Sequence, residues 1–207
     1  YDDASDARTA AELAQRFTER DHDKPDHADF VIGGTGTETS LAIMPVLQQS
    51  GIPFLSLGSG SRIIDPSHRL VFKTPPTERA AVRVLLTDMK KRGYTRAALL
   101  AEDSEFGKEL AKELRDQTGR NSLGRRTYGV SLALDQNYAP NESDIAQKVA
   151  QLKNTAGAQA IAVFGLGQSP ALVTRKIREN GITLPLYHSH GVETGEFTQI
   201  ASKDAEG

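Results

Sequence analysis

The sequence predicts an α/β fold built on parallel β-sheets. Short apolar runs of strand length alternate along the chain with patterns typical of amphipathic helices. Several of these runs are continuously apolar, as expected for strands that helices cover on both faces of a sheet. Alternation at this spacing indicates right-handed crossover connections and therefore parallel pairing. The predicted strands are residues 29–32, 53–57, 70–73, 97–101, 126–132, 160–164 and 184–188.

Helical patterns lie between most of the predicted strands, with apolar side chains recurring every three or four residues. Ser5 or Asp6 can cap the first helix, and Pro45 predicts a kink in the second. Ser169 and Pro170 predict the cap and the first turn of the last helix. The predicted helices are residues 10–17, 41–49, 78–91, 106–114, 145–152 and 169–180.

Composition excludes several classes of function. The formal net charge is −2, so no basic excess indicates a nucleic-acid partner. No apolar run approaches the roughly 20 residues that a membrane-spanning helix needs. The chain has no cysteine, which removes disulfides, thiolate nucleophiles and cysteine-based metal sites. Tyr1-Asp2-Asp3 is not typical of a natural start, so we expect the chain to be a piece of a longer protein.

The first candidate site is the glycine-rich loop 33–40, which follows a predicted strand and opens a helix. A dinucleotide-binding loop would need a third glycine where Thr39 stands and an acid after the next strand. A phosphate-binding P-loop would need a lysine that is missing. The remaining expectation is an anion bound at the start of a helix, with Thr37 or Thr39 adding a hydroxyl donor. The alternative is that these threonines only cap the helix.

A second loop, Gly58-Ser59-Gly60-Ser61, repeats this chemistry after the next strand. The carboxyl ends of neighbouring parallel strands share one edge of a sheet, where ligands of such folds bind. Two loops rich in hydroxyls and free of lysine and arginine would form a small neutral pocket. Such a pocket suits one carboxylate better than a triphosphate, although a plain surface turn is the competing interpretation.

Catalytic and metal-binding patterns are weak. His188 and His190 are two residues apart at a strand end, but no further ligands or zinc motif accompany them. Asp103 and Glu105 flank Ser104, a pattern that favours a helix cap over acid–base chemistry. The polar stretch 19–29 is typical of a solvated loop rather than a metal site. We therefore expect no enzyme activity, no metal and no cofactor.

Taken together, the motifs resemble the type I periplasmic binding proteins. The similarity is to the leucine/isoleucine/valine-binding branch of bacterial ABC uptake systems, and it runs through essentially all 207 residues. The resemblance rests on the order and spacing of the motifs more than on any single motif. The matching stretches are 1–6, 31–33, 51–56, 72–74, 106–107, 138–145 and 204–207.

The resemblance implies a fold of two doubly wound parallel-sheet lobes joined by a hinge, which closes over a small ligand without chemistry. It also implies that the sequence is a fragment. Residues 1–75 would be a partial first lobe and residues 76–207 a nearly whole second lobe, with the proline-rich stretch 74–77 as the passage between them. Relatives have a further strand and helix before this chain and more chain after it.

Ligand-binding residues of the first lobe follow from the resemblance by position. Thr37 matches a hydroxyl that holds the ligand carboxylate. Gly58 matches a backbone donor and acceptor position, and Gly60 matches a threonine whose hydroxyl is lost here. Ser59 or Ser61 would have to replace that hydroxyl.

In the second lobe, Phe106 matches an aromatic residue that covers the ligand, and an aromatic near Leu166 and Gly167 is lost. His190 matches the acidic residue that pairs with the ligand ammonium in amino-acid binders. A neutral imidazole offers only an ordinary hydrogen bond in place of that charge-assisted contact. The ligand is therefore not expected to be limited to simple α-amino acids, because a related organic acid or amide fits the carboxylate half of the site equally well.

The resemblance thus implies an extracytoplasmic or periplasmic solute-binding protein of an ABC importer. It would act as a monomer, take a small carboxylate or amino acid, and deliver it to an ABC permease in the membrane. The alternative is a ligand-sensing domain of a receptor or regulator with the same fold.

Overall fold

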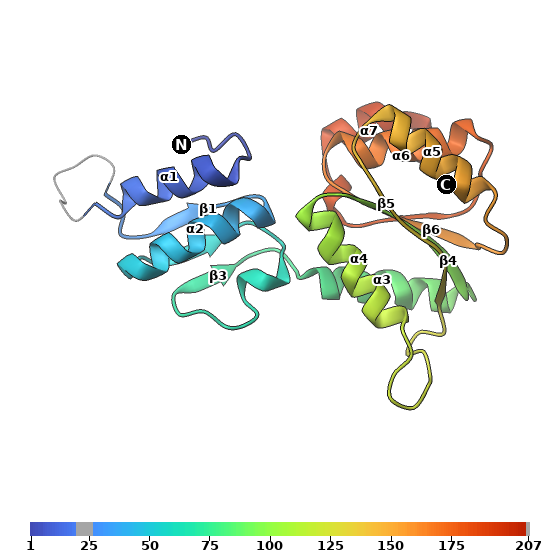
Figure 1. The fold of residues 1–207 in the computed structure, drawn as a ribbon, viewed down its shortest axis with the longest axis horizontal. Helices are drawn as coiled ribbons and strands as arrows, with labels where there is room; N and C mark the ends of the chain where they lie inside the picture. The colour runs from blue at the N-terminus through green and yellow to red at the C-terminus, as the bar shows by residue number, and fades with distance from the viewer. Residues whose placement is uncertain (20–26, 206–207) are drawn as a thin grey trace. The chain divides into compact units, whose positions relative to one another are not determined.

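The computed structural model describes residues 1–19 and 27–205. Residues 20–26 of the predicted polar loop, and residues 206–207 of the last matching stretch, lie outside the described residues. The chain divides into two compact units, Tyr1–Glu78 and Arg79–Gly207. Both are α/β units with parallel sheets, which confirms the predicted fold class (Figure 1). Among the described residues, no helix is long and apolar enough to cross a membrane.

The first unit contains a three-stranded parallel sheet in the order β1-β2-β3. Its elements are α1 (Ala7–Phe17), β1 (Val31–Gly33), α2 (Thr37–Ser50), β2 (Phe54–Ser56), the 3-10 turn η1 (Ser61–Ile63) and β3 (Val71–Lys73). Asp6 is the N-cap of α1 and accepts a hydrogen bond from the Thr9 amide. Pro45 lies inside α2, which begins four residues before its predicted start.

Side chains along these short strands point alternately to the two faces of the sheet, and only one of these faces is buried. Val31, Phe54 and Val71 are paired across the three strands and are buried in one core with α1 and α2. Ile32 and Phe72 point to the opposite face and are more than half exposed. The helices of the described part of this unit therefore cover one face.

The second unit contains a four-stranded parallel sheet in the order β5-β4-β6-β7. Helix α3 (Glu78–Lys91) leads into it and has the predicted bounds. The elements that follow are β4 (Arg96–Glu102), α4 (Glu105–Thr118), β5 (Ser131–Tyr138), α5 (Glu142–Lys153), β6 (Ala160–Phe164), α6 (Gln168–Glu179), β7 (Leu186–His188), η2 (His190–Val192), α7 (Gly195–Ala201) and η3 (Ser202–Ala205).

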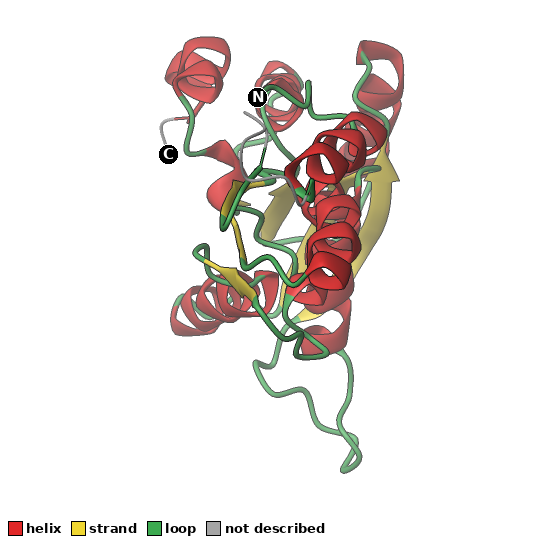
Figure 2. Ribbon diagram, turned by 90° about the vertical axis from the view of Figure 1, so that its left-hand side faces the viewer, coloured by secondary structure: helices red, strands yellow, loops and turns green. Residues whose placement is uncertain are grey.

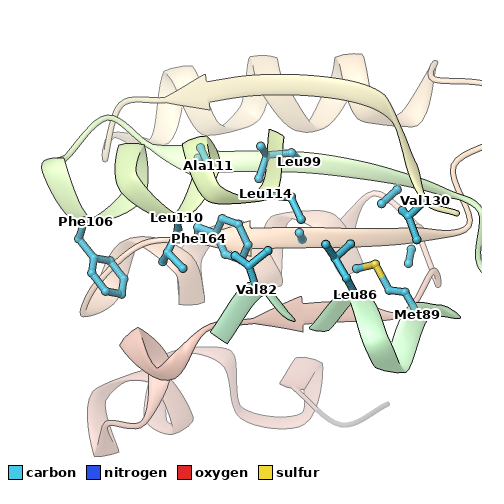
Figure 3. Packing of buried hydrophobic residues seen from close by; sticks show 14 residues of the cluster. Val82, Leu86, Met89, Leu99, Phe106, Leu110, Ala111, Leu114, Val130 and Phe164 are labelled. Carbon is cyan, nitrogen blue, oxygen red and sulfur yellow. The ribbon is translucent and has the colours of Figure 1, made fainter. Parts of the chain in front are cut away.

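Helices cover both faces of this sheet, as continuously apolar strands require. One core joins α3 and α4 to Leu99 and Phe164 (Figure 3). The other core joins α5 and α6 to Leu100 and Val163. Neighbouring residues of β4 thus point into different cores, because successive side chains of a strand alternate between faces.

Two predicted elements of this unit are placed differently. The strand predicted at 126–132 runs instead from Ser131 to Tyr138. Residues 119–130 belong to a long loop that projects from the unit between α4 and β5 (Figure 2). Helix α6 starts at Gln168 with Gly167 as its N-cap, so Ser169 is not the cap, whereas Pro170 lies in the first turn as predicted.

Candidate functional site

The first unit brings its candidate residues to one edge of its sheet. Strands β1 and β2 are parallel, and their carboxyl ends lead into loops 34–36 and 57–60. These loops carry the glycines and hydroxyls that the sequence singled out, and Thr37 opens α2 directly after the first of them. The edge has the position at which open parallel sheets bind ligands.

A buried hydrogen-bonded chain links the two loops. The Ser40 hydroxyl donates to the Gly34 carbonyl at 2.6 Å, and its oxygen lies 2.7 Å from the Ser56 hydroxyl. Because the Ser40 proton is committed to Gly34, Ser56 is the donor in the second contact. Ser56 in turn accepts from the Gly58 amide at 2.9 Å. The Gly58 amide is therefore occupied by Ser56 and is not a free donor for a ligand.

Close packing explains why glycine stands at position 58. A Cβ there would lie 2.8 Å from the Ser40 hydroxyl and 3.0 Å from the Gly36 carbonyl oxygen. Both distances are shorter than ordinary van der Waals contact. The second loop therefore approaches the start of α2 as closely as a backbone without side chain allows.

Thr37 is the first residue of α2 and is only 4% exposed. Its hydroxyl is buried and has no hydrogen-bond partner among the described residues. Thr39, by contrast, donates its hydroxyl to the Gly36 carbonyl at 3.1 Å. The N-cap residue Gly36 has no side chain to cap the helix, so neither threonine is the cap. The Thr37 hydroxyl is an unused donor at the positive end of a helix.

Ser59 and Gly60 are both buried in the second loop. The Ser61 hydroxyl donates to Glu78 at 3.2 Å. Of the two serines expected to replace the lost threonine hydroxyl, Ser59 is therefore the one whose hydroxyl has no such bond among the described residues. The Lys73 ammonium, at the end of β3, donates to the Ser59 carbonyl. The sequence indicated an uncharged edge, because Lys73 lies outside both glycine clusters and only the fold brings it there.

The second unit brings Phe106 and His190 together. Their rings meet edge to face, with centroids 5.4 Å apart. Phe106 lies at the start of α4 and is only 4% exposed, since it also belongs to the core beneath that helix (Figure 3). A Cβ at Gly191 would lie 2.8 Å from the Phe106 ring and 2.4 Å from the Gly165 carbonyl oxygen. The loops after β4, β6 and β7 therefore converge around Phe106.

A buried acid that the sequence analysis did not single out organises this edge. Glu102, at the end of β4, accepts from the Leu166 amide at 3.2 Å and from the Ser169 hydroxyl. Tyr138 donates to the Phe164 carbonyl at 3.2 Å and also contacts Ser169. Burial raises the pKa of Tyr138, and the negative Glu102 raises it further, against the lowering effect of Ser169. The hydroxyl therefore stays protonated and available as a donor.

The two histidines do not form one site. His188 contacts Thr174 at 3.2 Å and stacks edge to face on Phe197, whereas His190 faces Phe106. Burial, opposed by a hydrogen bond to the Val163 backbone and helped by the charge of Arg178, lowers the pKa of His188 to about 4. The described residues contain no cluster of three or more potential metal ligands.

Ser104 and the neighbouring Asp103 have structural partners. Ser104 is the N-cap of α4 and accepts from the Gly107 amide at 3.2 Å, as the capping interpretation predicts. Asp103 forms an ion pair with Lys108 at 2.9 Å.

Comparison with known proteins places this geometry in a family. The sequence model of the periplasmic binding proteins matches residues 1–207. A curated relative, Leu/Ile/Val-binding protein homolog 3 of Brucella melitensis, is 20% identical over 100% of the chain and 53% of its own length. The chain thus spans about half the length of this relative.

Solved structures show the same fold. An extracellular ligand-binding receptor from Rhodopseudomonas palustris has a TM-score of 0.87 at 22% identity, covering 100% of this chain and 55% of its own. The leucine binding protein LivK of Thermotoga maritima has a TM-score of 0.82 at 18% identity, and the match covers 100% of this chain and 55% of LivK. LivJ of Streptococcus pneumoniae, solved with isoleucine, has a TM-score of 0.81 at 16% identity, and the match covers 98% of this chain and 54% of LivJ.

These findings confirm the resemblance to the leucine/isoleucine/valine-binding branch, and the matched proteins are binding proteins rather than enzymes. The chain belongs to the periplasmic binding protein family.

Proposed function

We propose that this chain is part of an extracytoplasmic solute-binding protein of an ABC importer. Its ligand is a small molecule with a carboxylate, either an amino acid or a related organic acid or amide. Family membership supports the binding role, and the leucine-binding LivK and the isoleucine-bound LivJ support this ligand class by analogy. We further propose that residues 1–75 form a partial first lobe and residues 76–207 a nearly whole second lobe, and that the protein acts as a monomer with a membrane permease. The junction residues 76–78 open this proposed second lobe but belong to the first compact unit of the structure.

The unpartnered hydroxyl of Thr37 is the observation that carries the proposal. A buried polar group without a partner costs about 1–3 kcal/mol, so its retention at this place needs a reason. A ligand carboxylate would accept from this hydroxyl and from the first-turn amides of α2, which receive no side-chain cap. The helix dipole favours a negative charge at the same point.

Ser59 and Gly60 complete the proposed carboxylate site in the first unit. The carbonyl of Gly58 would accept from a donor elsewhere on the ligand, since a carboxylate has no proton to donate. The ammonium of Lys73, held by the Ser59 carbonyl, adds a positive charge that favours an anionic group. In the second unit we propose Phe106 and His190 as ligand-binding residues, because they pack together at the carboxyl edge of that sheet.

A thermal-shift screen of the full-length protein tests this proposal. Amino acids, aliphatic acids, aromatic acids and the matching amides are each added in excess. A ligand at a hundred times its dissociation constant adds about 2.7 kcal/mol to the free energy of unfolding. We expect at least one carboxylate to stabilise the protein and its carboxyl ester to have no effect. Stabilisation by nucleotides alone would contradict the proposal.

A further inference from the structure

The strongest unexplained group in the first unit is the carboxylate of Glu78. Its side chain is fully buried, with 0% exposure. One oxygen, Oε2, accepts from the Ser61 hydroxyl at 3.2 Å. The other, Oε1, is buried and has no hydrogen-bond partner among the described residues. A fully buried carboxylate is thus held by a single neutral donor.

This arrangement is unfavourable for the isolated unit. Buried acids are normally paired with a cation or receive several hydrogen bonds, because removing a charge from water is costly. An acid in the first turn of a helix gains from the helix dipole, but that gain is also available to an exposed side chain and does not require burial. The free oxygen therefore indicates a missing donor rather than a helix-capping role.

The position of Glu78 connects it to the proposed carboxylate site. Its partner Ser61 lies two residues after Ser59, in the loop whose Gly58 approaches the Gly36 carbonyl at the start of α2. Thr37 is the next residue after Gly36. One edge of the first unit thus carries two buried polar groups without partners, a hydroxyl donor at Thr37 and a carboxylate acceptor at Glu78.

The two groups are complementary to the two ends of one kind of small molecule. A carboxylate satisfies the donor, and a positively charged amino group satisfies the acceptor through a charge-assisted hydrogen bond. We propose that Glu78 Oε1 accepts a hydrogen bond from the ammonium of the bound ligand. This contact rests on the proposed function, and it narrows the ligand class to small zwitterions that carry both an amino group and a carboxylate.

Glu78 is therefore a specificity-determining residue, because its free oxygen distinguishes ligands that carry a positively charged amino group from those that do not.

Matched ligand pairs test the inference by titration calorimetry on the full-length protein. Each pair is an amino acid and the acid that lacks its amino group: leucine with isocaproate, phenylalanine with hydrocinnamate, and alanine with propionate. We expect the wild-type protein to bind the amino acid of at least one pair more than tenfold tighter than its partner. Glu78→Gln keeps the size of the side chain but removes its charge. This substitution should lower the affinity for that amino acid at least tenfold and change the affinity for the matching acid less than threefold.

Glu142→Gln is the matched control, because Glu142 is also the first residue of a helix but is exposed. It should leave both affinities unchanged. Equal weakening of both pair members by Glu78→Gln would show a structural role and overturn the inference. Equal affinities within every pair in the wild-type protein would overturn it without any variant, while the proposed carboxylate site would stand. Failure of the wild-type protein to bind either member of any pair would contradict the proposed function itself.

Discussion

The hydroxyl oxygens of Ser40 and Ser56 lie 2.7 Å apart in the buried interior of the first unit. Ser40 belongs to the first turns of α2, and Ser56 is the last residue of β2. Their contact joins the helix to the strand and, through Gly34 and Gly58, fixes both glycine-rich loops. The loops are therefore held in place before any ligand binds, which lowers the cost of binding.

Replacing Ser40 by alanine should lower the free energy of unfolding by about 1–3 kcal/mol, because the Gly34 carbonyl and the Ser56 hydroxyl lose a buried partner. Urea denaturation measures the change. Ser50→Ala is the control, since Ser50 lies in the same helix but is exposed, and we expect a change within about 0.5 kcal/mol. Equal effects of both substitutions would show that the contact contributes nothing.

Gly58→Ala should destabilise the first unit by about 1–3 kcal/mol, because the added methyl group meets backbone and side-chain atoms that have little room to move. It should also weaken ligand binding, since the loop must shift. Gly33→Ala is the matched control, as a Cβ there has no heavy atom within 4 Å. Chemical denaturation and calorimetry of both variants check this prediction, which fails if the two behave alike.

His188 should make the protein less stable in acid. Its pKa is about 4 in the folded protein and 6.5 in its ordinary state, so the unfolded chain binds the proton more tightly. The free energy of unfolding is therefore at its full value above the ordinary pKa of His188, and it decreases as the pH falls from about 6.5 towards 4. The expected loss is about 3 kcal/mol. Urea denaturation across this range should show a smaller loss for His188→Gln. The same pH dependence in that variant would assign the effect to other groups.

Phe106→Ala should lower the free energy of unfolding by about 3–5 kcal/mol, because the ring is part of the core beneath α4 as well as of the candidate site. Loss of binding in this variant would therefore not separate ligand contact from folding. Phe106→Leu, which keeps most of the apolar volume, is the better variant for calorimetry. Leu123→Ala, at an exposed loop residue, is the stability control and should be nearly neutral.

Elements with a strong apolar pattern were predicted well from the sequence. Strand β6 and helix α3 have their predicted bounds, since every residue of β6 is buried and α3 presents a regular apolar stripe to one core. Strand β5 was misplaced because it is an edge strand with mixed polar and apolar residues. Gly129, with a positive φ of 73°, lies in the loop that the sequence assigned to the strand.

The candidate site could be predicted only in part. Glycines and hydroxyls after strands are visible in the sequence, and they located Thr37, Gly58, Ser59 and Gly60 on one sheet edge. The buried acids Glu78 and Glu102 were missed because an acid in a sequence signals exposure. Their burial depends on partners as distant as Ser61 and Ser169, and local patterns do not reveal such contacts.

The most direct test of the central claim is calorimetry of Thr37→Val and Thr37→Ser with the carboxylate that the thermal-shift screen identifies. Valine keeps the shape of threonine without the hydroxyl. We expect it to weaken binding by about 1–3 kcal/mol, while Thr37→Ser binds almost normally. Thr39→Val, which removes a hydroxyl that already has a partner in the same turn, should change the affinity little. Wild-type affinity in Thr37→Val would contradict the claim that this hydroxyl holds the ligand carboxylate.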